Sequence, residues 1–400
     1  MNKLASKQRK KWLRNLMALT LVLALAIGIT ASPAVAEQTS TPAAEPTAGL
    51  SLNAAIAQAL KHSEAVSKAS KEMDRTKEIR DYAGSQLDYI PVGHIGIPAV
   101  EMAYTNVLAS DLTWQLSQRS FTVAEDKVIL DTCKKYWEVL KAVEKLKTAE
   151  SSQAAALRQL QNARMAQQVG MSLIPNQSPT QLVLAAEAQY AGAQAAVAAA
   201  QNGRDNAYNS FNQHIGLWIT ERPQLSDSIK FEPLQVSDLE HEVSRVLERS
   251  PVIWQADEMV NMKKFLKDIT IYSSGQYRPG EARRIEVEQA ELDAASAKKL
   301  VAMATRTLYY QTRNLEEAYA GSLEVVKMAE ENLRVKRLML EVGMATEAEV
   351  KAEEKKLDSA RYTALEMAAT HSYMKLAFSK PWAADLSSAG SSPASSAAEE

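Results

Sequence analysis

Cysteine and aromatic residues are scarce in this sequence of 400 residues, and each scarcity excludes a class of site or core. Cys133 is the one cysteine, so a single chain can form no disulfide framework, no Cys-rich metal site and no two-thiol redox pair. It lies at helical spacing with Leu130, Trp137 and Leu140, which predicts a buried position in a helix seam and not a reactive thiol. Aromatic residues make up 6% of the chain, and alanine supplies much of the 46% that is hydrophobic. This composition favours close contacts between helices over a thick globular core.

Recognisable catalytic and metal-binding motifs are absent as well. None of the histidines has the spacing of a metal site; they are His62, His94, His214, His241 and His371. The sequence has no Walker loop, no nucleophile elbow and no dinucleotide-binding fingerprint. Its many Glu and Lys residues fall on helix faces typical of a solvated surface, as in residues 351–360. We therefore expect no enzyme activity, no metal and no cofactor.

The first 36 residues have the parts of a secretory signal peptide. Six basic residues precede the apolar run 16–29, and Ala34, Val35 and Ala36 form an A-x-A cleavage pattern before Glu37. The alternative is an uncleaved N-terminal anchor. Removing six basic and no acidic residues changes the formal net charge from -2 to -8, and a net acidic exported protein is a poor binder of nucleic acid. No later apolar run approaches the roughly twenty residues that a membrane helix needs.

Residues 281–340 contain no proline and carry the most regular helical repeat of the sequence. Three sets of residues recur every seven positions, as in a coiled-coil seam: Ala290, Ala297 and Ala304; Val301, Leu308 and Leu315; and Tyr319, Val326, Leu333 and Leu340. The shift of four between Leu315 and Tyr319 is a stutter, which lets a helix change partners along its length. At about 1.5 Å per residue this helix would be on the order of 90 Å long. Such a helix requires other long helices to pack against.

Further helices are predicted over about 50–84, 123–169, 180–215, 238–267 and 346–379. Three stretches favour short strands instead. Leu112, Trp114 and Leu116 alternate with polar residues, which predicts a strand over 111–121, and weaker signals mark 90–97 and 269–273.

The two halves of the chain align as an internal repeat. At an offset of 187 residues the pairs are Leu52 with Leu239, Ile56 with Val243, Leu60 with Leu247, Ser63 with Ser250, and Val66 with Ile253. At an offset of 173 they are Tyr136 with Tyr309, Leu160 with Leu333, Arg164 with Arg337, Val169 with Val342, Gly170 with Gly343, and Met171 with Met344. Chance helical periodicity does not easily reproduce an Arg-x4-Val-Gly-Met string, so we infer a duplication.

These patterns divide the chain into six segments. They are a signal peptide (1–36), a flexible linker (37–49), a first helical repeat (50–216), a connector (217–236), a second helical repeat (237–380) and a disordered tail (381–400).

Over residues 50–380 the chain resembles the TolC-like outer-membrane efflux protein family. The resemblance rests on LSLNAAIAQALKHS at the first helix, on the paired QVGM and EVGM turns, and on the Ala-rich helix after each turn. It implies a homotrimer in which each chain supplies two helix–strand–strand–helix repeats. In that family the strands close a barrel in the outer membrane, and the helices form a tunnel across the periplasm that docks on the adaptor of an inner-membrane pump.

The resemblance also implies a contact site, because the family's Gly-plus-apolar turns at the tunnel tip contact the adaptor. They match Gly170, Met171, Gly343 and Met344 here. The strand signals fall short of the family's four membrane strands, each of about 9–11 residues. We therefore expect an all-α dominated fold of long antiparallel coiled-coil helical hairpins in two tandem repeats, with few short strands where the family has its barrel.

The function expected from this resemblance is that of a tunnel subunit for efflux or type I secretion, a passive duct that docks on a pump adaptor. Its partners would be two further copies of itself, a membrane-fusion adaptor and an inner-membrane pump, at the cell outer membrane and in the periplasm. The alternative is a non-conducting structural coiled-coil protein of the cell envelope. A membrane-fusion adaptor is a further alternative, but the Gly-rich lipoyl and barrel segments of such proteins are not found.

Overall fold

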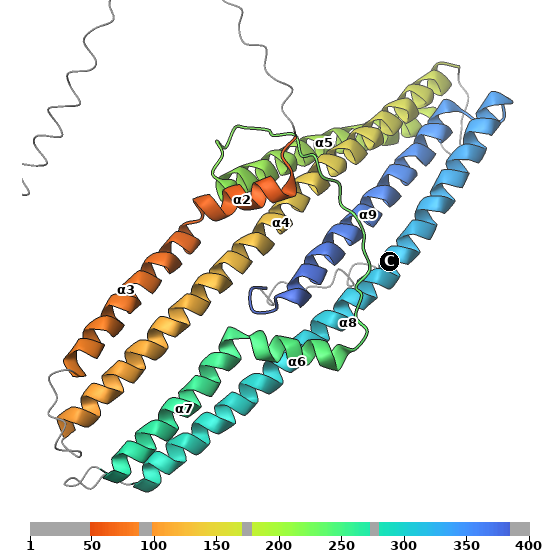
Figure 1. The fold of residues 1–400 in the computed structure, drawn as a ribbon. Helices are drawn as coiled ribbons and strands as arrows, with labels where there is room; N and C mark the ends of the chain where they lie inside the picture. The colour runs from red at the N-terminus through yellow and green to blue at the C-terminus, as the bar shows by residue number, and fades with distance from the viewer. Residues whose placement is uncertain (1–48, 88–97, 170–177, 273–279, 385–400) are drawn as a thin grey trace, which may run out of the picture. The chain divides into compact units, whose positions relative to one another are not determined.

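The computed structural model describes residues 49–87, 98–169, 178–272 and 280–384. The chain divides into two units, 1–47 and 48–400, and all described residues belong to the second. Within these residues the structure consists of helices and connecting segments, without a β-strand (Figure 1). The helices are α2 (Leu52–His62), α3 (Glu64–Leu87), α4 (Pro98–Val169), α5 (Pro179–Ile215), α6 (Leu239–Arg249), α7 (Pro251–Tyr272), α8 (Gly280–Glu341) and α9 (Glu347–Ser379). The predicted helical fold of long hairpins is thereby confirmed.

Helix α4 is the centre of this arrangement. It packs against α2, α3, α5, α7 and α9, while α8 packs against α6, α7 and α9 (Figure 1). Each long helix thus contacts antiparallel neighbours along its length, as the predicted length of α8 requires. Across the described helices, none combines the length and the apolar character that a membrane crossing requires.

The strand predicted over 111–121 is wrong, because this segment lies inside α4. No glycine or proline interrupts residues 99–169, so the helix propagates through them once it has formed. The alternation that suggested a strand has a helical explanation. Trp114 lies under the guanidinium of Arg80 on α3, at 3.8 Å from the ring centroid, and Ser117, three residues on, exchanges a buried hydrogen bond with Thr76 of α3 (2.7 Å). Residues three apart therefore face the same neighbouring helix.

The other strand predictions have different outcomes. Residues 269–272 of the stretch 269–273 continue α7, so that prediction is also wrong: the helix that begins at Pro251 runs through them without a glycine or proline to end it. Ser273 and the whole of 90–97 lie outside the described residues.

The first predicted helix, 50–84, is two helices that meet at Ser63, whose backbone is extended. Ser250 has the same extended backbone between α6 and α7, and α2 and α6 are each 11 residues long. The two serines are partners in the repeat alignment. This correspondence is what a duplication predicts, although the duplication itself stays a prediction.

The predicted seam of α8 is observed where it meets α9. Leu333 is buried, and Val326 and Leu340 pack beside it against Val350 and Leu357 of α9. Further back along α8, Leu308 is also buried, as its place in the second seam predicts.

The largest core lies where α2, α4 and α5 meet. Tyr136 of α4 is fully buried and meets the ring of Phe211 of α5 edge-on, with 5.8 Å between ring centroids. Its hydroxyl donates to the carbonyl of Leu50 (2.9 Å) and accepts from the N–H of Asp227 (3.2 Å). One side chain of α4 therefore fastens both the segment before α2 and the segment after α5.

The segment after α9, described as far as Ala384, is fastened to α4. Lys380 donates to one oxygen of the buried Asp126 carboxylate (2.5 Å), and the Trp382 indole N–H donates to the other (2.9 Å). Residues 381–384, placed in the tail by the sequence, thus pack against α4.

Candidate functional site

The turn between α8 and α9 depends on the backbone conformation of one glycine. Gly343 has a left-handed conformation with φ of 77°. Its N–H donates to the carbonyl of Leu340 (3.0 Å), and the N–H of Met344 donates to the carbonyl of Met339 (2.7 Å). These two bonds form a Schellman motif, which glycine closes without the steric cost of a side chain. The glycine cap expected at this position is therefore observed.

Capping boxes start both of the helices that return from the turns. Thr346 accepts from the N–H of Glu349 (3.3 Å), and the Glu349 carboxylate accepts from the N–H of Thr346 (3.4 Å). Ser178 and Gln181 make the same pair of contacts at the start of α5, each at 3.3 Å. The sequence prediction missed both boxes, although the S-x-x-Q and T-x-x-E spacings signal them.

Of the four residues predicted to contact an adaptor, the structure describes two, Gly343 and Met344. Met344 is 77% exposed and so contributes little packing to its own turn. Val342 beside it and Val169 at the end of α4 are also largely exposed. Gly170 and Met171 lie outside the described residues.

The end of α4 and the start of α9 lie side by side. Arg158 of α4 forms an ion pair with Glu347 of α9, with 3.5 Å between nitrogen and oxygen. The two helix ends line a groove of about 740 Å³, whose apolar part on α4 is formed by Met165, Ala166 and Val169. The two hairpin ends therefore present one continuous surface with exposed apolar side chains.

An ion pair braces each hairpin below its turn. Arg164 contacts Glu187 across α4 and α5 (2.8 Å), and Arg337 contacts Glu354 across α8 and α9 (3.0 Å). The hydrogen bond from Lys351 lowers the pKa of the Glu354 carboxyl, and Arg337 adds to this effect against the opposing effect of burial. Glu354 therefore carries its negative charge at neutral pH and holds the two helices together.

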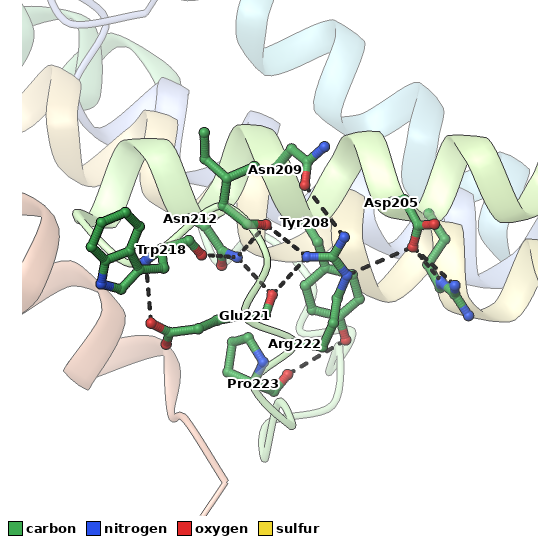
Figure 2. Close-up of polar contacts among 10 residues, drawn as sticks. Asp205, Tyr208, Asn209, Asn212, Trp218, Glu221, Arg222 and Pro223 are labelled. Atoms are coloured by element: carbon green, nitrogen blue, oxygen red, sulfur yellow. Dashed lines mark hydrogen bonds and ion pairs between the residues drawn. The ribbon is translucent and has the colours of Figure 1, made fainter.

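The connector between the two halves is held to α5 by hydrogen bonds from a buried amide. Asn212 of α5 is fully buried, and its amide donates to the carbonyls of Trp218 (3.0 Å) and Glu221 (2.7 Å) (Figure 2). Arg222 donates to the Glu221 carbonyl as well (2.8 Å). This loop is thus closely tied to α5, yet it leaves the Trp218 side chain 80% exposed.

Further along the connector, a second polar centre joins it to α8 and α9. Glu316 of α8 accepts from the N–H of Leu234 (2.5 Å) and contacts the Nε2 atom of buried His371 of α9 (3.2 Å). Phe231 stacks on Tyr319 with 4.1 Å between ring centroids and lies against His371. The connector is therefore fastened to both hairpins.

The single cysteine of the chain lies in the helical core. Cys133 is 2% exposed, as predicted, and burial raises the pKa of its thiol to about 11. It is therefore a protonated core residue at neutral pH. No group of three His, Cys, Asp or Glu residues within the described ranges could hold a metal ion.

The fold is similar to that of several solved outer-membrane channels. The Campylobacter jejuni CmeC outer membrane channel matches with a TM-score of 0.58 at 12% identity, over 82% of this chain and 85% of that one. The Vibrio cholerae outer membrane protein VceC matches with a TM-score of 0.57 at 12% identity, over 83% and 96%. The open state of the Neisseria gonorrhoeae MtrE outer membrane channel matches with a TM-score of 0.57 at 15% identity, over 84% and 89%.

No protein-family model matches the sequence, and no curated protein is similar to it at the level of sequence. The likeness is one of fold, and it confirms the resemblance at that level: this chain has the helical architecture of outer-membrane channel subunits.

Proposed function

We propose that this chain is a tunnel subunit for efflux or type I secretion. The observation that supports the proposal is the likeness of fold to outer-membrane channels, which extends over most of this chain and most of theirs. The signal peptide predicted over 1–36 fits export from the cytoplasm. The site of action in this proposal is the outer membrane and the periplasm.

The tunnel is a passive duct made by three copies. Each copy contributes α4, α5, α8 and α9, so that twelve helices surround an aqueous lumen. The duct performs no chemistry, in keeping with a protein that is not an enzyme and needs no cofactor. The energy for transport comes from an inner-membrane pump.

The docking site for the pump's membrane-fusion adaptor is formed by the hairpin turns. Gly343 holds the turn in a shape that needs no packing from Met344, which leaves this soft apolar side chain free for a partner. Gly170 and Met171 have the same role in the other hairpin. Pure helix capping is the competing explanation, and capture of an adaptor by a variant with both turn methionines replaced separates the two.

The test is the state of the purified protein. Cell envelopes are fractionated, the chain is extracted with detergent, and its mass and image are recorded by light scattering and negative-stain microscopy. The proposal expects an envelope-associated particle of three copies with a central channel. A freely soluble monomer, or an oligomer without a channel, would overturn it in favour of a non-conducting structural coiled-coil protein of the envelope.

A further inference from the structure

The turn that follows α5 has a fixed starting direction. Gly216 ends the helix in the left-handed conformation, with φ of 79°. A Cβ added at this glycine would clash with the ring of His62, the last residue of α2. Any other residue is therefore opposed both by backbone strain and by a steric clash. The path of the chain out of α5 is thus fixed against α2.

Hydrogen bonds hold the residues that come after this glycine. The buried Asn212 amide donates to the carbonyls of Trp218 (3.0 Å) and Glu221 (2.7 Å) (Figure 2). The N–H of Trp218 donates to the Glu221 carboxylate (3.3 Å), and the N–H of Glu221 donates back to the Trp218 carbonyl (3.0 Å). Arg222 donates to the carbonyl of Ile219 (2.8 Å). The backbone of Trp218 is therefore held through both its N–H and its carbonyl.

Residues 216–222, which we call the Trp218 loop, nevertheless leave two apolar side chains in solvent. Trp218 is 80% and Ile219 is 56% exposed. Figure 2 shows the indole ring on the far side of the loop from Arg222. A side chain on a backbone that is already fixed loses less conformational entropy when a ligand covers it. The Trp218 loop thus presents a preorganised aromatic surface.

The side chains near Trp218 in the sequence are polar and carry no net charge. The exposed ones are Gln213, Thr220, Glu221, Arg222 and Gln224. A membrane surface attracts basic residues beside several apolar anchors, and the core of a protein interface is depleted of charge. Amide and hydroxyl groups around one aromatic ring instead suit a neutral ligand that has many hydroxyl groups and one apolar face. A sugar ring has both of these properties.

The Trp218 loop lies near the middle of α4. The hydroxyl of Thr132 on α4 contacts Nε2 of His214 in the last turn of α5 (3.0 Å). At about 1.5 Å per residue, α4 extends on the order of 50 Å to either side of Thr132. Figure 1 shows the end of α5 beside α2, far from both ends of α4. A ligand of this loop therefore meets the molecule along the length of its helices and not at a hairpin end.

We propose that the Trp218 loop binds the glycan strands of the cell wall. The proposal rests on the proposed function, because a duct that crosses the periplasm passes through the glycan layer between the two membranes. The strands are polymers of N-acetylated amino sugars. Their C–H faces can stack on the indole, and their hydroxyl and amide groups can pair with Gln213 and Thr220. The contact holds the tunnel in the wall at a site separate from the turns that dock the adaptor.

Co-sedimentation with purified cell-wall sacculi tests this proposal. The full-length protein in detergent is mixed with increasing amounts of sacculi, and the pelleted fraction is measured. Trp218→Ala should weaken binding about tenfold. Trp218→Phe should restore part of it, because phenylalanine keeps a smaller aromatic face. Oligomers of N-acetylglucosamine should displace the parent protein from the sacculi.

The matched control is Tyr82→Ala. Tyr82 is an aromatic residue of α3 that is 69% exposed and lies outside the Trp218 loop. This variant should bind sacculi as the parent does. Since both replaced side chains are exposed, Tyr82→Ala and Trp218→Ala should keep the circular dichroism spectrum and the thermal midpoint of the parent.

Light scattering on the same samples separates this proposal from the proposed function. Weaker binding by Trp218→Ala than by Tyr82→Ala supports the glycan site. A trimer that does not bind sacculi, or that binds them equally well after Trp218→Ala, overturns the glycan site and leaves the tunnel standing. Binding to lipopolysaccharide vesicles but not to sacculi also overturns it. A monomer whose binding depends on Trp218 supports the glycan site and overturns the tunnel.

Discussion

At the scale of single residues, Gly343 in the turn after α8 lets the cost of an unfavourable backbone conformation be measured without the cost of a steric clash. A Cβ added at Gly343 would meet no heavy atom within 4 Å, whereas the backbone φ of 77° is one that L-residues avoid. Gly343→Ala should therefore cost about 1–2 kcal/mol through backbone conformation alone. The measurement is the midpoint of thermal unfolding, which should fall.

Gly84 of α3 is the matched control for this substitution. A Cβ there also meets nothing within 4 Å, but the backbone is ordinary helix. Gly84→Ala should stabilise the protein by about 0.5–1 kcal/mol, because alanine favours a helix more than glycine does. A rise in the midpoint for both variants would show that the Gly343 conformation is not a constraint.

Glu316 is the residue whose charge state should couple stability to acid. Burial raises the pKa of its carboxyl, but the hydrogen bonds from Leu234, His371 and Arg313 outweigh burial and hold it below the ordinary value of 4.5. Because the folded-state pKa is lowered, the stabilisation is present above the ordinary pKa and is lost as the pH falls through the folded one. Glu316→Gln should lower the free energy of unfolding at pH 7. It should also make that free energy fall less steeply as the pH drops below about 4.5.

The adjacent Glu317 is exposed and serves as the control. Thermal midpoints of the parent, Glu316→Gln and Glu317→Gln are compared from pH 3 to 7. If Glu317→Gln flattens the acid limb as much as Glu316→Gln does, the connector contact is not the origin of the acid sensitivity.

At the scale of elements, the contact of Asp126 with the end of α9 should hold residues 380–384 on α4. Asp126→Ala leaves the Lys380 ammonium and the Trp382 indole N–H without their shared acceptor. The expected loss is about 1–3 kcal/mol. Backbone hydrogen exchange in residues 376–384 should become faster, while exchange in the hairpin of α8 and α9 near Gly343 stays at the parent rate.

The control is Glu125→Ala, at the neighbouring position, which should leave the exchange rates of both segments unchanged. Equal acceleration by the two variants would show that Asp126 does not hold residues 380–384 on α4.

The helices could be predicted from the sequence because their signals are local and repeated. The seam through Val326, Leu333 and Leu340 and the length of α8 follow from seven-residue spacing and the absence of proline. The segment 111–121 is ambiguous in the sequence, because five alternating residues fit a strand as well as they fit a helix when considered alone. Only the packing of Trp114 and Ser117 against α3 decides between them.

The polar contacts of the connector could not be predicted in this way. The Asn212 amide reaches carbonyls six and nine residues away, and Glu316 meets Leu234 and His371 at separations of 82 and 55 residues. No periodicity encodes such pairs, because they depend on how the helices meet after folding. The Gly343 turn lies between these cases: its glycine indicated the cap, but the exposure of Met344 had to come from the structure.

At the scale of the whole described molecule, the two hairpins are joined in three ways. Helix α4 packs directly on α9, the connector is fastened to α4 through Tyr136 and to α8 through Glu316, and the end of α9 is fastened to Asp126. These contacts keep the ends of the hairpins beside each other. A partner that binds at the turns can therefore engage both hairpins at once, and loss of one apolar contact need not abolish binding.

For this reason the decisive variant changes both turns. Met171→Asp together with Met344→Asp places a charge at the apolar position of each turn, and a buried unpaired carboxylate would oppose an apolar contact with a partner. Because Met344 is 77% exposed, its replacement should leave helicity and oligomeric mass unchanged. Circular dichroism and light scattering check these two properties. Co-purification with a membrane-fusion adaptor reports docking and should fall at least tenfold.

The control is Met102→Asp, which changes an exposed methionine near the other end of α4 and should retain the adaptor. If the double variant captures the adaptor as the parent does, the two turns are helix caps and the docking surface lies elsewhere.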